Sequence, residues 1–181
     1  MAEPEVSKAM IKEYMKNRKV LIADSSKSFS AVVQKTCIEY GSDYQNTFIG
    51  STWERAENMM NKNPEIIFSE YQITGHYCLD LAPMQRQIYE KQQDKVFIVI
   101  TSTSTDSAVA EAAEEEIDAY LLKPFSLGQL QETIKKVVGS KIQPSDYSIL
   151  LQEAQDLLKA NKIPEAEEKF LKATGMSNKP S

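Results

Sequence analysis

Short apolar runs alternate with longer amphipathic segments along most of the chain. Runs of strand length cover 20–23, 66–68, 96–100 and 119–122, and a weaker run covers 45–49. Buried parallel strands are typically continuous apolar runs of this length, whereas helices show periodic apolar positions. Strict alternation of the two patterns predicts an α/β fold. Its centre is a doubly wound, five-stranded parallel sheet with helices on both faces.

The intervening segments carry apolar residues at helical spacing. Helices are expected around 27–40, 53–60, 83–92, 106–113 and 126–138. Gly41 follows the first of these as a C-terminal stop signal, and Gly139 is expected to end the last one. Ser126 and Gln129 have the spacing of a capping box, which predicts that the last helix opens there.

Both ends of the chain carry segments outside this alternating pattern. Residues 1–17 form an N-terminal extension whose Met10, Ile11, Tyr14 and Met15 predict a short amphipathic helix and a further docking surface. The main domain is expected at 18–139, a polar linker at 140–145, and a helical hairpin at 146–178. The residues expected to make the hairpin's helix–helix contacts are Leu150, Ala154, Leu157, Ala166, Phe170 and Ala173.

Composition and charge narrow the class of protein. A net charge of −5 over 181 residues disfavours partners such as nucleic acids and anionic membranes. Two cysteines in a chain of this size do not make a disulfide scaffold, which indicates a reducing compartment. The N-terminus lacks the apolar core of a signal peptide, and no apolar run has the length of a membrane span. A cytoplasmic protein with protein partners is expected.

Polar residues follow four of the predicted strands. Asp24 and Ser25 follow the first strand, Glu70 the third, Thr101 the fourth and Lys123 the fifth. In a doubly wound sheet, ligands bind outside the carboxyl ends of the strands, so these side chains are expected to converge. Two carboxylates suit a divalent cation, while a hydroxyl and an ammonium suit phosphoryl oxygens. The pattern predicts a site for a cation and an acyl phosphate.

Together these residues resemble a response-regulator receiver domain, from about Arg18 to Val138. The resemblance lies in the first strand with Asp24-Ser25, in the strand ending at Glu70, in Thr101, and in Lys123-Pro124-Phe125. It implies a flavodoxin-like, CheY-like fold and a role in two-component phosphorelay signal transduction. It further implies that Glu70 stands at the phosphoacceptor position and that Asp24 and Ser25 form the acidic pocket. Thr101 and Tyr120 would be the switch residues, and Lys123 the lysine that contacts phosphate.

Four residues depart from the family pattern. Glu70 replaces the usual aspartate, and Ser25 replaces the second acid of the metal pair. Thr74 and Cys78 replace a usual proline and glycine. We therefore interpret the domain as a degenerate, or pseudo-, receiver that is not an enzyme, with Glu70 imitating a phosphorylated aspartate. No cofactor is expected; magnesium would bind weakly at most, with Asp24 and Glu70 as weak candidate ligands.

Three alternatives remain open from the sequence. Glu70 and Lys123 could form an ion pair with no signalling role, since such pairs are common without function. The domain could be a working phosphorelay receiver that accepts phosphate from a partner kinase. A small enzyme on a flavodoxin-like fold is disfavoured, because the sequence has no glycine-rich phosphate loop and no nucleophile–base pair. His76, the single histidine, is interpreted as a solvated side chain.

The C-terminal hairpin resembles one tetratricopeptide repeat. A single repeat cannot bury its apolar faces, and such arrays need about three units for stability. Either the natural chain continues into further repeats, or the hairpin packs on a second copy in a homodimer or on the receiver. The receiver resemblance also implies a partner-binding face formed by the fourth helix, fifth strand and fifth helix.

Overall fold

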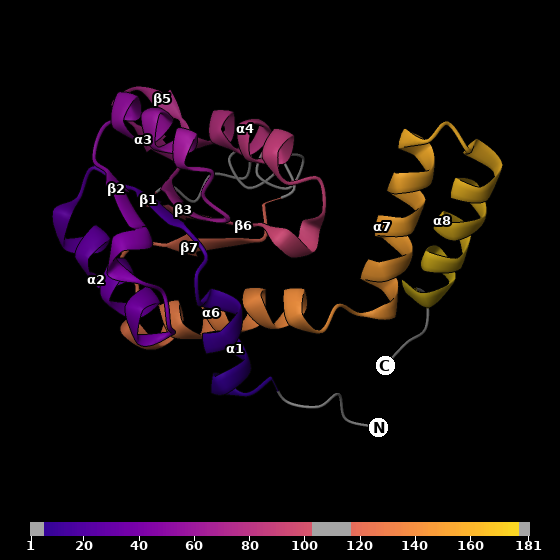
Figure 1. Ribbon diagram of the computed structural model, residues 1–181, viewed down its shortest axis with the longest axis horizontal. Helices are drawn as coiled ribbons and strands as arrows, with labels where there is room; N and C mark the ends of the chain where they lie inside the picture. Colours follow the sequence, from indigo (N-terminus) through magenta and orange to yellow (C-terminus); the bar gives the residue numbers. More distant parts are fainter. Residues whose placement is uncertain (1–5, 103–116, 178–181) are drawn as a thin grey trace. The chain divides into compact units, whose positions relative to one another are not determined.

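The computed structural model describes residues 6–102 and 117–177 (Figure 1). The chain forms two compact units, Met1–Ile142 and Gln143–Ser181, called unit 1 and unit 2 below. The predicted fourth helix, around 106–113, lies outside the described residues. None of the helices described here is long and apolar enough to cross a membrane.

Unit 1 is built on a five-stranded parallel sheet with the order β2-β1-β3-β6-β7. The strands are β1 (Val20–Ala23), β2 (Thr47–Gly50), β3 (Ile66–Glu70), β6 (Val96–Thr101) and β7 (Ala119–Leu122). β1 pairs with β2 on one side and with β3 on the other, so the strand order reverses between β1 and β3. The predicted doubly wound α/β fold is confirmed, and its ligand position lies at the carboxyl ends of these strands.

Helices cover both faces of the sheet (Figure 1). One face carries α1 (Lys8–Met15), α2 (Lys27–Glu39) and α6 (Leu127–Ile142), and the other carries α3 (Trp53–Met59) and α4 (Leu81–Ile88). Short 3-10 turns lie at Tyr44–Asn46, Met60–Lys62, Cys78–Asp80 and Gln92–Asp94.

The strands read as continuous apolar runs because both of their faces are buried. Successive side chains of a strand point to opposite faces. Val20 and Ile22 therefore enter the core under α1, α2 and α6, whereas Leu21 and Ala23 enter the core under α3 and α4. All six residues of β6 are buried as well. This double burial is the physical reason for the pattern on which the fold prediction rests.

The N-terminal helix α1 does not provide a docking surface as expected from its sequence. Ile11 and Met15 are buried in the core of unit 1 together with α2 and α6. The loop after α2 lies close to α1 at Gly41, whose φ is +102°. A Cβ added to Gly41 would lie only 2.9 Å from the Lys12 carbonyl oxygen. The apolar face of α1 is thus occupied by the domain itself.

The expectation that the last receiver helix ends at Gly139 is wrong. The capping box does open α6: the Gln129 N–H donates to Ser126 Oγ, and the Ser126 N–H donates to Gln129 Oε1. The helix then continues through Gly139 to Ile142. Gly139 is buried, and a Cβ added to it would lie 3.4 Å from the Val6 side chain. Gly139 is thus a buried residue in the interior of the helix and does not terminate it.

A small hairpin after β3 was not predicted. It pairs β4 (Gln72–Ile73) with β5 (His76–Tyr77) in antiparallel register. Its two turn residues, Thr74 and Gly75, have φ values of 47° and 88°. Positive φ at both central residues is what a two-residue type I′ hairpin turn requires. Thr74 replaces the usual proline here, and its Oγ1 accepts a hydrogen bond from the Trp53 N–H at the start of α3.

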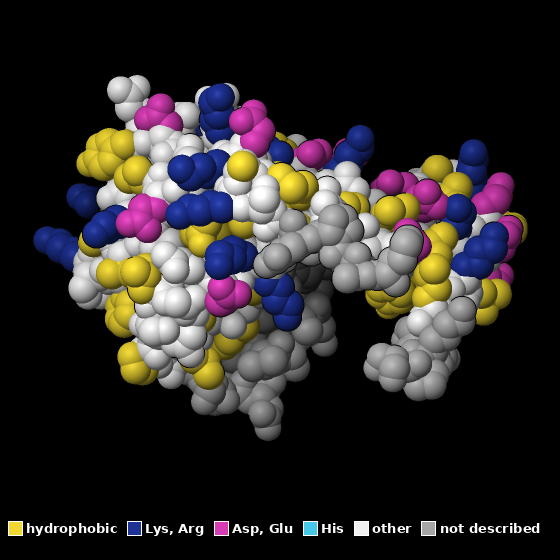
Figure 2. Space-filling view, turned by 90° about the horizontal axis from the view of Figure 1, so that it is seen from below, with side chains coloured by type: hydrophobic (Ala, Val, Ile, Leu, Met, Phe, Trp, Pro, Cys, Tyr) yellow, Lys and Arg dark blue, Asp and Glu magenta, His cyan; other side chains and the backbone are white. Residues whose placement is uncertain are grey.

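Unit 2 is an antiparallel pair of helices, α7 (Asp146–Lys159) and α8 (Ile163–Ser177). Of the six predicted contact residues, the three alanines are fully buried: Ala154, Ala166 and Ala173. Leu150, Leu157 and Phe170 are half-buried. Other apolar side chains reach the surface between charged ones (Figure 2). The helices therefore approach closely through small residues, and most of their large apolar side chains are incompletely covered.

Candidate functional site

The site begins at the end of β1, where Asp24 is held by the backbone on both sides. The Asp24 N–H donates to the Gly50 carbonyl at 3.2 Å, which continues the pairing of β1 with β2. Its Oδ1 accepts a 2.8 Å hydrogen bond from the Ser26 N–H, just before α2 begins. Asp24 is 3% exposed, so its carboxylate is fixed in one place at the switch point of the sheet.

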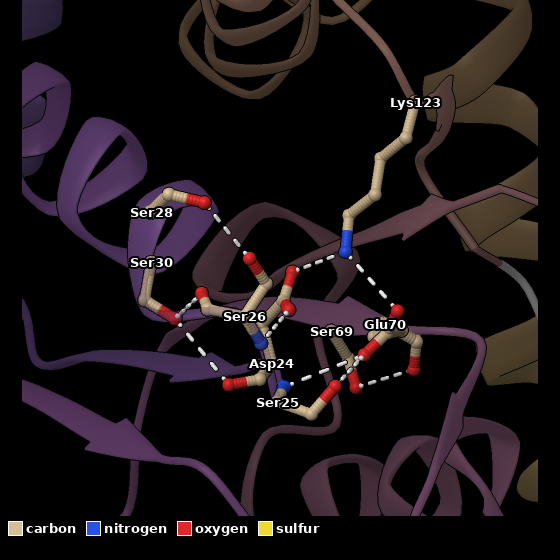
Figure 3. Close-up of polar contacts among 8 residues, drawn as sticks. All are labelled: Asp24, Ser25, Ser26, Ser28, Ser30, Ser69, Glu70 and Lys123. Carbon is tan, nitrogen blue, oxygen red and sulfur yellow. Dashed lines mark hydrogen bonds and ion pairs between the residues drawn. The ribbon is translucent and has the colours of Figure 1, made fainter.

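Lys123 brings the two predicted carboxylates together (Figure 3). Its Nζ lies 2.7 Å from Asp24 Oδ2 and 3.1 Å from Glu70 Oε1. The Lys123 N–H donates to the Thr101 carbonyl at 2.7 Å, which fixes the loop after β7. The peptide bond between Lys123 and Pro124 is cis. Residues at the carboxyl ends of three different strands thus meet through the buried ammonium group of Lys123.

Ser25 holds the other oxygen of Glu70. Ser25 Oγ donates to Glu70 Oε2 at 2.7 Å, and the Ser25 N–H lies 3.4 Å from the same oxygen. A second acid at position 25 would place a negative charge against this carboxylate. Serine instead supplies a donor, so the two departures from the receiver pattern are in direct contact with each other.

The pKa values of Asp24 and Glu70 are shifted in opposite directions. Burial raises the pKa of Asp24 above its usual range, although the hydrogen bonds from Lys123 and Ser26 oppose this. Burial also pushes the pKa of Glu70 upward, but the hydrogen bonds from Ser25 and Lys123 outweigh it and leave that pKa lowered. Glu70 is therefore firmly ionised at neutral pH, which makes the site a source of fixed negative charge.

The predicted switch residues lie beside the ion pairs. Thr101 ends β6 and is 2% exposed, and the side chain of Tyr120 on β7 is half-buried. Burial raises the pKa of the Tyr120 phenol, while a hydrogen bond with the Thr101 side chain acts in the opposite direction. The structure thus links Thr101 to Tyr120 by side chain and to Lys123 by backbone.

As arranged, the strand-end carboxylates are engaged by other groups of the chain. All four carboxylate oxygens of Asp24 and Glu70 already have partners in the chain. Magnesium prefers an octahedral set of free oxygen ligands, usually with several waters. Over residues 6–102 and 117–177, no three His, Cys, Asp or Glu side chains are grouped so as to hold a metal ion.

Two contacts of this region were not predicted from sequence. The Lys123 ammonium lies 4.6 Å from the ring centre of Phe29 on α2, and Phe29 in turn packs on Phe125. His76, expected to be solvated, is exposed but stacks on Trp53 with ring centres 4.9 Å apart. Phe29 reads in sequence as an ordinary apolar position of a helix, so nothing there signals a cation–π contact.

Cys78, which stands where the family usually has glycine, fills space in the core. It is 0% exposed among the residues under α3 and α4. Burial raises the pKa of its thiol to about 12, although a hydrogen bond with Ser69 opposes this. Cys37 is buried as well, and both cysteines are free. They behave as small apolar residues of the core.

Comparison with known proteins finds distant sequence relatives. Chemotaxis protein CheY-3 of Vibrio cholerae is 25% identical over 123 residues, which cover 67% of this chain and 92% of that protein. The DNA-binding transcriptional regulator NtrC of Azospirillum brasilense is 24% identical over 139 residues, 77% of this chain but 28% of NtrC. No family model matches the chain.

The fold agrees with these relatives. The solved structure of the chemotaxis response regulator CheY4 of Vibrio cholerae superimposes with a TM-score of 0.56, at 19% identity. The match covers 66% of this chain and 98% of that structure. Unit 1 thus has the CheY-like, flavodoxin-like fold, and the sequence relatives support a response-regulator receiver domain.

Proposed function

We propose that this chain is a protein-binding signalling adaptor whose receiver is not phosphorylated. Glu70 supplies a permanent negative charge at the phosphoacceptor position, and partner proteins bind unit 1 and the helical hairpin. The adaptor is cytoplasmic, has no enzymatic activity and needs no cofactor. The observation that carries this proposal is the position of the Glu70 carboxylate, held on one oxygen by Lys123 and on the other by Ser25.

An acceptor carboxylate must attack a phosphoryl donor with a free oxygen in the right orientation. Both oxygens of Glu70 are hydrogen-bonded, and the neighbouring acid that would help to hold a metal ion is replaced by Ser25. The extra methylene of glutamate also moves its carboxylate further from the strand than aspartate would. These features together support a site that carries charge without accepting phosphate.

The contacts around Lys123 support transmission of this charge to the surface. Glu70 binds the Lys123 side chain, the Lys123 backbone binds Thr101, and Thr101 is hydrogen-bonded to Tyr120. Tyr120 lies on β7, at the edge of the sheet. In this proposal the ionised Glu70 maintains the arrangement of β7 that a partner recognises.

The surface between β7 and α6 is the proposed partner site of unit 1. It has a pocket of about 340 Å³ whose lining includes Tyr120, Lys136 and Val137. Leu122 and Leu127 nearby in sequence are 46% and 51% exposed. Exposed apolar side chains with a polar rim are typical of protein-binding surfaces. The predicted contribution of the fourth helix lies outside the described residues.

A second candidate function is a working phosphorelay receiver. It is favoured by the contact of Asp24 with Lys123, at 2.7 Å, and by the position of Thr101 at the end of β6. In this alternative a partner kinase would displace Ser25 from Glu70 and phosphorylate that carboxylate or another side chain of the site.

Phosphorylation with a small donor distinguishes the two functions. The chain is incubated with acetyl phosphate, or with beryllofluoride, in the presence of magnesium and then studied by intact-mass and NMR measurements. We expect no adduct and no shift for the natural sequence. The matched control is the double variant Ser25→Asp/Glu70→Asp, which restores both acids and is expected to react. A phosphoryl adduct mapped to Glu70 would establish the second function instead.

A further inference from the structure

We propose that the Lys123 ammonium is the resident cation of the strand-end site. In this view Lys123 Nζ takes the place between Asp24 and Glu70 that a divalent ion would otherwise occupy, and Ser25 is a positioning residue that turns Glu70 toward it. The inference concerns the same site as the proposed function and rests on it in one respect, that the site works without metal-dependent phosphorylation.

The coordination of Lys123 is that of a central cation. Its Nζ contacts one oxygen of each carboxylate, at 2.7 and 3.1 Å, and its side chain is 5% exposed. The Asp24 side chain is 4% exposed and that of Glu70 20%. The ammonium group is therefore almost fully withdrawn from water and sits between two carboxylates that compensate its charge.

The surroundings of Lys123 favour the position of its ammonium group between the two carboxylates over a position that leaves room for an ion there. The Phe29 ring, 4.6 Å from Nζ, adds a cation–π contact on the side of α2. The hydrogen bond from the Lys123 backbone to the Thr101 carbonyl fixes the base of the side chain. A divalent ion between the carboxylates would repel this ammonium at short range in a poorly hydrated site.

Ser25 orients the Glu70 carboxylate by a hydrogen bond to one of its two oxygens. It donates to the Glu70 oxygen that does not contact Lys123, so that the other oxygen is directed at Nζ. The remaining Asp24 oxygen is held in the same manner by the Ser26 N–H. Each carboxylate thus has one oxygen bound to a fixed donor and one bound to the ammonium, and Figure 3 shows Nζ reaching both acids.

The test is a Mn²⁺ titration of the full chain and of substituted chains, followed by electron paramagnetic resonance of the free ion. Lys123→Met removes the cation, and Lys123→Arg is the matched control that keeps it. We expect no saturation of the natural chain or of Lys123→Arg below about 10 mM, and at least about tenfold tighter binding for Lys123→Met. Ser25→Ala should tighten binding about threefold, and Ser25→Thr, which keeps the hydroxyl, should not.

The outcomes separate this inference from the proposed function. Saturation of the natural chain at low millimolar Mn²⁺, or a folded Lys123→Met chain that gains no affinity, would overturn the resident-cation inference. Circular dichroism checks the fold, and Lys123→Gln replaces Lys123→Met if the latter does not fold. If neither substituted chain folds, the Mn²⁺ titration of the natural chain alone tests the resident-cation inference. Phosphorylation of Glu70 by acetyl phosphate tests the proposed function separately, whatever the Mn²⁺ result.

Discussion

The two units of this chain bury apolar residues in different ways. In unit 1, large side chains such as Phe68, Ile98 and Leu130 are 1% exposed or less and fill both sides of a sheet. In unit 2, the buried apolar residues among those described are alanines, while Ile163 and Leu171 are 58% and 67% exposed. Because hydrophobic stabilisation scales with the apolar area buried, the core of unit 1 contributes more to stability than the alanine contacts of unit 2 do.

The units also treat charge differently. Unit 1 withdraws Asp24 and Lys123 from water and holds them by several hydrogen bonds. The ion pairs of unit 2, such as Lys172 with Glu168, lie at the surface. Exposed pairs contribute little to stability, whereas removing one member of a buried pair is costly. Unit 1 thus places charged side chains in its interior, whereas unit 2 keeps its ion pairs at the surface.

The largest expected effect contrasts a phenylalanine from each unit. Phe68→Ala should lower the unfolding free energy of unit 1 by about 3–5 kcal/mol, since it leaves a cavity in a closed core. Phe170→Ala should cost unit 2 clearly less, about 1–2 kcal/mol, because Phe170 is half-buried. Urea denaturation measures both: Trp53, the single tryptophan, reports unit 1 by fluorescence, and circular dichroism adds the helices of unit 2. Equal losses would remove the contrast between the two cores.

A second prediction concerns what covers unit 2. We expect the chain to self-associate through its hairpins in a two-fold dimer, which is the simplest way to cover an exposed apolar face. Leu157→Asp should weaken this association at least about tenfold, close to 1.4 kcal/mol, by placing a charge in the contact. Ser148→Asp adds the same charge in the first turn of α7 and should not. Sedimentation velocity at high micromolar concentration measures the effect; a monomeric natural chain with an ordered hairpin contradicts it.

A third prediction concerns pH. The lowered pKa of Glu70 means that its contribution to stability is present above the pKa of an unfolded glutamate, about 4.3, and is lost as pH falls through the folded value. Asp24 has a raised pKa and acts in the opposite direction, so stability falls as pH rises toward its folded value.

Glu70→Gln should therefore destabilise unit 1 by about 1–2 kcal/mol at neutral pH and by nothing measurable well below pH 4, where both chains carry a neutral group. The matched control in unit 2 is Glu168→Gln, which removes a fully exposed charge and should change stability little at any pH. Thermal melts between about pH 3 and 7 compare the two. A pH-independent loss for Glu70→Gln would show that packing, not charge, is responsible.

Much of the fold could be predicted because its signals are local. The run Val20–Ala23 is apolar throughout because each face of this strand packs in a different core. The apolar run is visible in the sequence alone. The capping box of Ser126 and Gln129 depends on two residues three apart, and it is confirmed. Gly139 misled the prediction because glycine is a common stop signal for a helix, whereas here the helix continues to Ile142.

The candidate site shows the same division. Its residues could be named from the order of Asp24, Glu70, Thr101 and Lys123 along the chain, since parallel strands bring their ends to one edge. The ion pair of Glu70 with Lys123 was raised from the sequence as one alternative, but the other contacts at the site could not be predicted. The hydrogen bond of Ser25 with Glu70 joins positions 45 residues apart, and the ring of Phe29 approaches Lys123 from a helix that reads as merely amphipathic.

The sequence by itself determined the doubly wound sheet, the helices that flank it and the set of polar residues at its carboxyl edge. These follow from periodicity and from strand direction, which are properties of short segments. Only the tertiary structure decided that α1 belongs to the core, that α6 passes through Gly139, and that Lys123 lies between both carboxylates. The reason is physical: packing and ion pairing depend on distances between residues remote in sequence, and no local pattern encodes them.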